Sequence, residues 1–298
     1  MSLPPPQSAP PPVTEVGPTS EPPPAGDPPR WGLWMAPAAI VLGLGLGQIL
    51  VIVVNVIGQA AGGSTLRHPS PAVSLISDVL ADLAFVASAL YLVSRAGRLR
   101  AVDFGFFRTP LGRAAALVAG AGISYYLVTL VYANVFSLHA KYKLPSELQV
   151  NHSTAALVGA ALFVCVVAPI AEEFFFRGFL LRVLSGIRLT VAGRDGAPWL
   201  AAVIVGVLFG GAHLGSASPE YLVPLGFLGF VLCVLRILTR SLYPGMALHS
   251  LNNSLALGVN SLHWSGGAIL ALIGGALAVI AALVGPLSPG RASANRRE

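Results

Sequence analysis

Long apolar blocks separated by short polar segments dominate the chain from about residue 35 to residue 285. Most blocks approach the roughly 20 residues that a helix needs to cross about 30 Å of hydrocarbon. Segments of about 10 residues with alternating polarity, which are typical of membrane β-barrels, do not occur in this sequence. The pattern therefore predicts an all-α, polytopic integral membrane protein with about eight transmembrane helices. The predicted spans are 35–58, 76–95, 114–137, 154–185, 198–216, 221–240, 243–261 and 266–285.

The fourth block is too long for one perpendicular crossing of a bilayer. It is expected to tilt, to kink at Pro169, or to extend into water. In the fifth block, Gly206 and Gly210 are four residues apart, a spacing that lets two helices approach closely. We expect these glycines to have a structural role.

Both ends of the chain differ in composition from the apolar blocks. Residues 1–30 contain 12 of the 24 prolines and almost no large apolar side chains. Such a segment cannot bury enough apolar surface to offset its ordering entropy, which predicts a disordered tail with polyproline character. The expected organisation is this tail at 1–30, a transmembrane helical domain at 31–288 and a basic tail at 289–298.

Composition and charge agree with a membrane protein. Only 10% of residues are charged, whereas soluble domains average about 25%. The net charge of +6 does not indicate nucleic-acid binding, because the basic residues sit between apolar blocks and form no stripe. With both termini in the cytoplasm, 14 basic residues fall inside and 3 outside, the asymmetry that membrane insertion favours. We therefore predict cytoplasmic termini.

The two cysteines, Cys165 and Cys233, both lie inside apolar blocks. Two residues in such surroundings exclude a disulfide framework and a cysteine-based zinc site. We expect both to be small buried apolar side chains.

Ionisable side chains inside a bilayer are costly, so each one in an apolar block is a candidate for function. The densest group is Glu172, Glu173 and Arg177 in the fourth block. Glu173 and Arg177 are four residues apart and share a helix face, so we expect an ion pair between them. Glu172 points in a different direction and is left available as a general base. A structural ion cluster that holds helices together is the alternative interpretation.

Two further blocks carry polar side chains. His213 lies in the fifth block, where it could also be a packing residue. His249 and Asn253 share one face of the seventh block, where a hydrogen bond between helices is the alternative. Asp78 and Asp82, near the outer end of the second block, are explained by their position at the interface and are left out of the site.

Taken together, these motifs resemble the signature of the CAAX prenyl endopeptidase and bacteriocin-processing (CPBP, or Abi) membrane proteins. The resemblance covers about 154–261 and rests on three motifs that occur in order in separate predicted helices. These are Glu172-Glu173-x-x-x-Arg177, Phe209-x-x-x-His213 and His249-x-x-x-Asn253.

The resemblance implies an intramembrane endopeptidase. By that analogy, Glu172 and His213 activate a water that attacks the scissile carbonyl, and His249 and Asn253 stabilise the oxyanion. Glu173 and Arg177 would shape the site. The expected substrate is a hydrophobic or lipidated peptide or protein, and the alternative is a non-catalytic membrane immunity or scaffold protein of the same family.

The resemblance leaves the question of a metal open. Glu172, His213 and His249 could hold Zn²⁺ with one open position. The sequence lacks His-Glu-x-x-His, whose spacing places two histidine ligands on one helix turn. We therefore expect water activation without a metal cofactor, with zinc as the alternative.

A single site makes a geometric demand on the fold. In the predicted topology His249 lies near the cytoplasmic end of its helix, and His213 lies nearer the outer end of its own. Both imidazoles must nevertheless come within about 12 Å of each other to act on one substrate through hydrogen bonds and a water.

Overall fold

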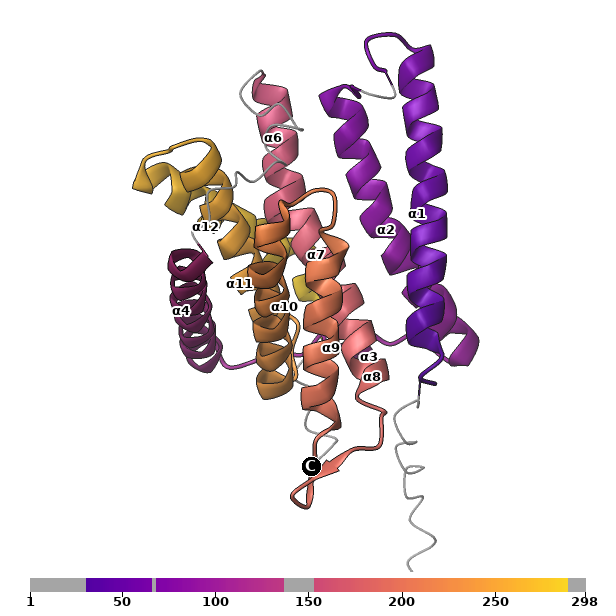
Figure 1. The fold of residues 1–298 in the computed structure, drawn as a ribbon, viewed down its shortest axis with the longest axis vertical. Helices are drawn as coiled ribbons and strands as arrows, with labels where there is room; N and C mark the ends of the chain where they lie inside the picture. Colours follow the sequence, from indigo (N-terminus) through magenta and orange to yellow (C-terminus); the bar gives the residue numbers. More distant parts are fainter. Residues whose placement is uncertain (1–30, 66–67, 137–152, 289–298) are drawn as a thin grey trace, which may run out of the picture.

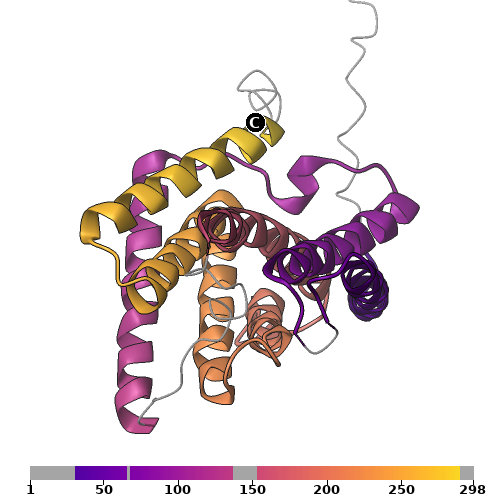
Figure 2. The same cartoon turned by 90° about the horizontal axis from the view of Figure 1, so that it is seen from above.

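The protein is a bundle of helices, several of which run roughly along its long axis (Figure 1), whereas two others lie across that axis (Figure 2). The computed structural model describes residues 31–65, 68–136 and 153–288. The hairpin of α1 (Met35–Ala60) and α2 (Pro71–Ala96) forms one edge of the bundle, and α4 (Leu111–Phe136) runs along the opposite edge (Figure 2). The segment from α6 to α8 (Thr154–Leu184) passes between them. The predicted tails at 1–30 and 289–298 lie outside the described residues.

The helices and strands have the following bounds. They are α1 Met35–Ala60, α2 Pro71–Ala96, α3 Ala101–Phe104, α4 Leu111–Phe136, α6 Thr154–Leu162, α7 Ala168–Glu172, α8 Leu181–Leu184, β1 Thr190–Val191, β2 Arg194–Asp195, α9 Ala197–Ala212, α10 Pro219–Thr239, α11 Tyr243–Leu255 and α12 Gly266–Val284. Three π-helical segments, Phe163–Val167, Glu173–Leu180 and Ala256–Ser261, and a final 3₁₀ turn at Gly285–Leu287 complete the described chain.

The predicted all-helical membrane fold is confirmed. Within the described residues, six helical segments are long and apolar enough to cross a membrane: α1, α2, α4, the continuous segment Thr154–Leu184, α10 and Gly266–Leu287. The other two predicted spans are helical but differ from these. α9 is apolar but has only 16 residues, and α11 carries the polar side chains of the candidate site.

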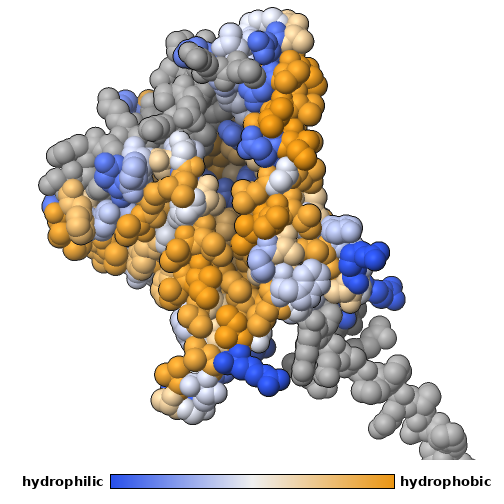
Figure 3. Space-filling view, turned by 45° about the vertical axis from the view of Figure 1, so that its right-hand side comes forward, coloured by the Kyte–Doolittle hydropathy of each residue, from blue (hydrophilic) through white to orange (hydrophobic). Residues whose placement is uncertain are grey.

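The surface fits a lipid environment. Apolar side chains cover most of the visible face in Figure 3, and hydrophilic residues gather near the lower end and around a hollow in the upper half. The fourth span is the most enclosed of the six. In its most apolar window 44% of the residues are buried, against 11% in α1 and in α4. The fourth span is therefore central, and α1 and α4 are peripheral.

The fourth span is one continuous helical segment with a π-helical turn on each side of Pro169. In the first turn, the Ala168 amide donates to the carbonyl of Phe163, five residues back. The carbonyl of Val164, which would be its partner in an α-helix, is thereby released. Pro169 has no N–H to donate, so the carbonyl of Cys165 also lacks its helical partner. Two adjacent carbonyls are thus free to accept side-chain hydrogen bonds.

The pairing of α9 with α10 depends on glycines, as the sequence predicts. A Cβ added to Gly206 would lie 2.9 Å from the Gly226 carbonyl oxygen, and one added to Gly210 would lie 2.6 Å from that of Leu222. Only glycine permits this approach. Gly229 on α10 makes room in the same way for Phe209, whose Cβ lies 2.8 Å from the position of an added Cβ.

Both cysteines are free and buried, as predicted. Two small elements were not expected from the hydropathy pattern. The strands β1 and β2 form an antiparallel hairpin whose turn residues, Ala192 and Gly193, both have positive φ. The other is the four-residue helix α3 between α2 and α4. Neither is long enough to produce a periodic pattern in the sequence.

Candidate active site

The candidate site forms where α11 packs against the fourth span. The two carbonyls released around Pro169 fix this contact. Ser250 Oγ donates to the Cys165 carbonyl over 2.6 Å, and Asn253 Nδ2 donates to the Val164 carbonyl over 2.8 Å. The irregular backbone of the fourth span thus fixes the position of the polar face of α11.

Glu173 and Arg177 form the predicted ion pair, which is confirmed. Arg177 Nη1 donates to Glu173 Oε1 over 2.8 Å, and neither residue is exposed. Arg177 Nη2 donates to the Gly229 carbonyl over 2.9 Å. The guanidinium carbon also lies 4.4 Å from the centroid of the Phe209 ring, in reach of a cation–π interaction. The fourth span is thereby joined to both α9 and α10.

Gly245 allows α11 to approach Glu173. A Cβ at this position would lie 2.5 Å from Glu173 Oε2, closer than nonbonded atoms tolerate. Gly245 was not among the predicted site residues. Its position one turn before His249 on the same helix was the signal that could have identified it.

His249 contacts both glutamates. Its Nδ1 lies 3.2 Å from Glu173 Oε1, and its Nε2 lies 3.8 Å from Glu172 Oε2. The imidazole is buried. The glutamates differ in access, since the Glu172 side chain is 18% exposed and that of Glu173 is 1% exposed. Arg177 pairs with Glu173, and within the described residues Glu172 has no arginine or lysine partner, as the sequence predicts.

His213 caps the C-terminal end of α9. Its Nδ1 lies 2.8 Å from the carbonyl oxygen of Phe209. A carbonyl oxygen can only accept, so Nδ1 carries a hydrogen and the neutral ring keeps a lone pair at Nε2. Within the described residues, His213 makes no ion pair or hydrogen bond with Glu172 or Glu173.

The ring of Phe209 lies against both imidazoles. Its centroid is 5.0 Å from that of His213 and 5.6 Å from that of His249. The two imidazole centroids are therefore at most 10.6 Å apart, the sum of these two distances. This satisfies the 12 Å limit, although the two residues lie toward opposite ends of their predicted spans.

Asp82 on α2 is a neighbour that the sequence analysis left out. It lies close enough to Glu172 for the two charges to interact. Its Oδ2 atom is buried and has no hydrogen-bond partner within the described residues, and the same is true of Glu172 Oε2. Interface position alone does not explain this carboxylate. The four-residue spacing of Asp78 and Asp82 along α2 does not indicate that Asp82 faces the fourth span.

The structure does not group the three residues named for zinc into a metal site within the part of the chain that it describes. Within them, no group of three or more His, Cys, Asp or Glu side chains is placed to hold a metal ion. Of the three predicted ligands, Glu172 and His249 are neighbours, but His213 does not join them. Whether the reaction needs a metal stays a prediction that chelation can test.

Comparison with known proteins identifies the central part of the chain. Residues 154–255 match the family model described as type II CAAX prenyl endopeptidase Rce1-like. This segment is Rce1-like. The match confirms the predicted resemblance to the CPBP family, and it contains all the candidate site residues. The match of this segment supports a CAAX-type, protease-like function and a multi-pass membrane protein.

Two curated proteins are similar over more limited stretches. One is the uncharacterized protein YyaK of Bacillus subtilis, 29% identical over 201 residues, or 60% of this chain and 62% of that protein. The other is an uncharacterized 24.3 kDa protein of Escherichia coli, 29% identical over 135 residues, or 44% of this chain and 59% of that protein. The chain therefore spans about three fifths of the length of each. No solved structure matches.

Proposed function

We propose that this chain is an intramembrane endopeptidase that hydrolyses a peptide bond in a hydrophobic or lipidated substrate. One observation carries the proposal. His249 contacts the carboxylates of both glutamates, whereas Arg177 compensates only Glu173. A structural ion cluster would need only the Glu173–Arg177 pair, because a second buried carboxylate adds desolvation cost without stabilising the fold. The Rce1-like match supports the same reaction class.

His249 is placed to donate a hydrogen bond to the oxyanion. Its Nδ1 lies 3.2 Å from Glu173 Oε1, and its Nε2 lies 3.8 Å from Glu172 Oε2. Glu173 thus orients the ring. In the proposed reaction His249 acts with a hydrogen on each nitrogen, donating from Nδ1 to Glu173 and from Nε2 to the oxyanion.

His213 differs from His249 at Nε2, where it is placed to accept a hydrogen bond. Its Nδ1 hydrogen is committed to the Phe209 carbonyl, so Nε2 can accept a proton. In the proposed reaction, Glu172 and the His213 Nε2 atom hold the attacking water between them. Glu172 removes one proton from the water as its oxygen attacks the scissile carbonyl carbon. The proton then passes to the leaving amine as the C–N bond breaks.

Asn253 completes the proposed oxyanion site. One hydrogen of its amide is donated to the Val164 carbonyl. The second hydrogen is available to the oxygen that becomes negative when the tetrahedral intermediate forms. His249 lies four residues earlier on α11, so the two donors share one face of the helix.

A cleavage assay in detergent tests the proposal. The purified full chain is incubated with a farnesylated peptide and with the same peptide lacking the lipid, and the products are measured by mass spectrometry. The matched pair of variants is Glu172→Gln and Glu220→Gln, because Glu220 is an exposed glutamate in the first turn of α10. Loss of a general base costs about 10²–10⁴-fold in rate.

We expect Glu172→Gln to lose cleavage by that factor and Glu220→Gln to match the wild type. Size-exclusion profiles and melting temperatures of the variants establish that both still fold. Cleavage by Glu172→Gln at the wild-type rate would refute the assignment of the base. Absence of any cleavage by the wild type, with a cellular phenotype that survives Glu172→Gln, would instead favour the non-catalytic immunity or scaffold protein.

A further inference from the structure

A chain of side-chain hydrogen bonds connects α4 with the candidate site. The Tyr126 hydroxyl donates to Asn252 Oδ1 over 3.0 Å. Asn252 Nδ2 donates to Asn253 Oδ1 over 3.3 Å, and Asn253 Nδ2 donates to the Val164 carbonyl over 2.8 Å. A residue on a peripheral helix is thereby linked to the amide that the proposed reaction uses.

These bonds fix the orientation of the Asn253 amide from both ends. An asparagine side chain has one acceptor and two N–H donors. Its oxygen is held by Asn252, and one N–H is held by the Val164 carbonyl. Turning the amide over would place its oxygen against that carbonyl oxygen, where two acceptors repel. Within the described residues, the second N–H is the one group of this amide that no hydrogen bond occupies.

Tyr126 is not required for the packing of α4. Tyr125, its neighbour, is buried against α10 and α11 in a cluster that includes Leu228 and Leu248. Gly122 brings the same face of α4 close to Leu248, whose Cδ1 would lie 3.2 Å from an added Cβ. Tyr126 itself is 40% exposed. Removing its hydroxyl therefore breaks the hydrogen bond to Asn252 and leaves this packing in place.

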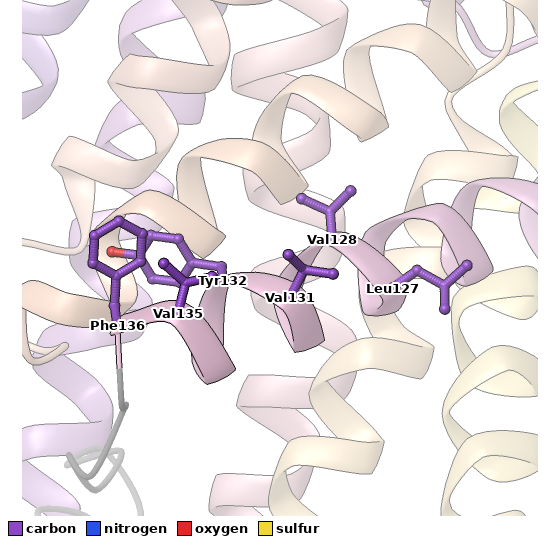
Figure 4. A pocket seen from close by; sticks show the side chains of 6 residues that line it. All are labelled: Leu127, Val128, Val131, Tyr132, Val135 and Phe136. Carbon is purple, nitrogen blue, oxygen red and sulfur yellow. The ribbon is translucent and has the colours of Figure 1, made fainter.

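The rest of the outer face of α4 is apolar. Figure 4 shows Leu127, Val128, Val131, Tyr132, Val135 and Phe136 along this face. Tyr132 packs on Phe136, with ring centroids 4.6 Å apart, and its hydroxyl makes no hydrogen bond within the described residues. Besides the buried Tyr125, the helix thus carries Tyr126 and Tyr132, six residues apart, and of these two Tyr126 bonds to Asn252.

We propose that Tyr126 and Asn252 are positioning residues that hold the Asn253 amide with its second N–H directed at the oxyanion. This inference rests on the proposed function. Without Asn252 the amide can turn, and its N–H is correctly placed for only part of the time. The interaction is made in the transition state and not with the bound substrate, so its loss lowers kcat and leaves KM unchanged.

Steady-state kinetics of the full chain in detergent, on a peptide that the wild type cleaves, test the inference. Tyr126→Phe and Asn252→Ala break the chain at successive bonds, and Tyr132→Phe is the matched control. Removal of an oxyanion donor costs about 10²–10³-fold in kcat, which is the loss expected for Asn253→Ala. For a donor that is only misaligned we expect a loss of about tenfold, with KM within about twofold of wild type.

A double-mutant cycle separates positioning from a general effect on the protein. If Tyr126 acts through Asn253, Tyr126→Phe lowers kcat in the wild type and has no further effect in Asn253→Ala. A tenfold loss in both backgrounds would overturn the inference, because the hydroxyl would then act elsewhere. If Asn252→Ala fails to fold, Tyr126→Phe alone still decides between these outcomes.

The two levels of proposal fail differently. A wild-type protein that cleaves no peptide refutes the proposed function, and the inference falls with it. A wild-type protein that cleaves, with Asn253→Ala impaired and Tyr126→Phe unchanged, refutes only the role of Tyr126 and Asn252. Equal losses in Tyr126→Phe and Tyr132→Phe would also refute it, since they would indicate a general effect of α4.

Discussion

Arg177 provides the most quantitative test of how the site is held together. It is unexposed, donates to Glu173 Oε1 and to the Gly229 carbonyl, and lies over the Phe209 ring. Replacing it by methionine keeps much of the apolar length of the side chain but removes all three interactions. Glu173 is then left buried without its counter-charge. Breaking a buried ion pair on one side costs about 3–5 kcal/mol, and we expect Arg177→Met to lose that much stability.

The double variant Glu173→Gln/Arg177→Met separates the two contributions. It removes the charge that the single variant leaves unpaired, so we expect it to regain at least about 1–2 kcal/mol of the loss, the excess cost of a buried charged group without a partner. Unfolding of the detergent-solubilised chain by SDS titration, followed by circular dichroism, measures both variants. Two results would refute the reasoning. One is a loss of unfolding free energy below about 0.5 kcal/mol in Arg177→Met, and the other is a double variant no more stable than Arg177→Met.

Three further outcomes are expected. Gly245→Ala places a Cβ 2.5 Å from Glu173 Oε2, so kcat should fall by about tenfold as Glu173 shifts away from His249; wild-type kcat would contradict the close approach. Ser250→Ala leaves the Cys165 carbonyl unpaired and should lower the unfolding free energy by about 1–3 kcal/mol, whereas the exposed Ser94→Ala should not; equal losses would contradict the role of the released carbonyls. Treatment with EDTA followed by gel filtration should leave the cleavage rate unchanged, and restoration of a lost rate by Zn²⁺ would favour the zinc alternative.

Local features of the fold could be predicted because they depend on residues close in sequence. Hydropathy alone located the helical segments, and the i, i+4 spacing was enough to predict the Glu173–Arg177 pair. Pro169 was expected to disturb the fourth span. The consequence for Cys165 also follows from the sequence, because a proline deprives the carbonyl four residues before it of a helical partner.

Contacts between helices could not be predicted in the same way. That His249 lies between Glu172 and Glu173 depends on the close approach at Gly245 and on the π-helical turns of the fourth span. Asp82 comes near Glu172 because α2 packs against the fourth span. The positions of Asp78 and Asp82 in the sequence do not encode that packing. The link from Tyr126 to Asn252 joins residues 126 positions apart, and no periodicity relates them.

The most direct test of the central claim is cleavage of one susceptible peptide in H₂¹⁸O by the wild type, Glu172→Gln and Glu220→Gln. The claim is that the partly exposed Glu172 activates a water inside the bundle. We predict a new peptide carboxylate carrying ¹⁸O from the wild type and Glu220→Gln, formed at least about 100-fold more slowly by Glu172→Gln. Labelled product formed by Glu172→Gln at the wild-type rate would contradict the account.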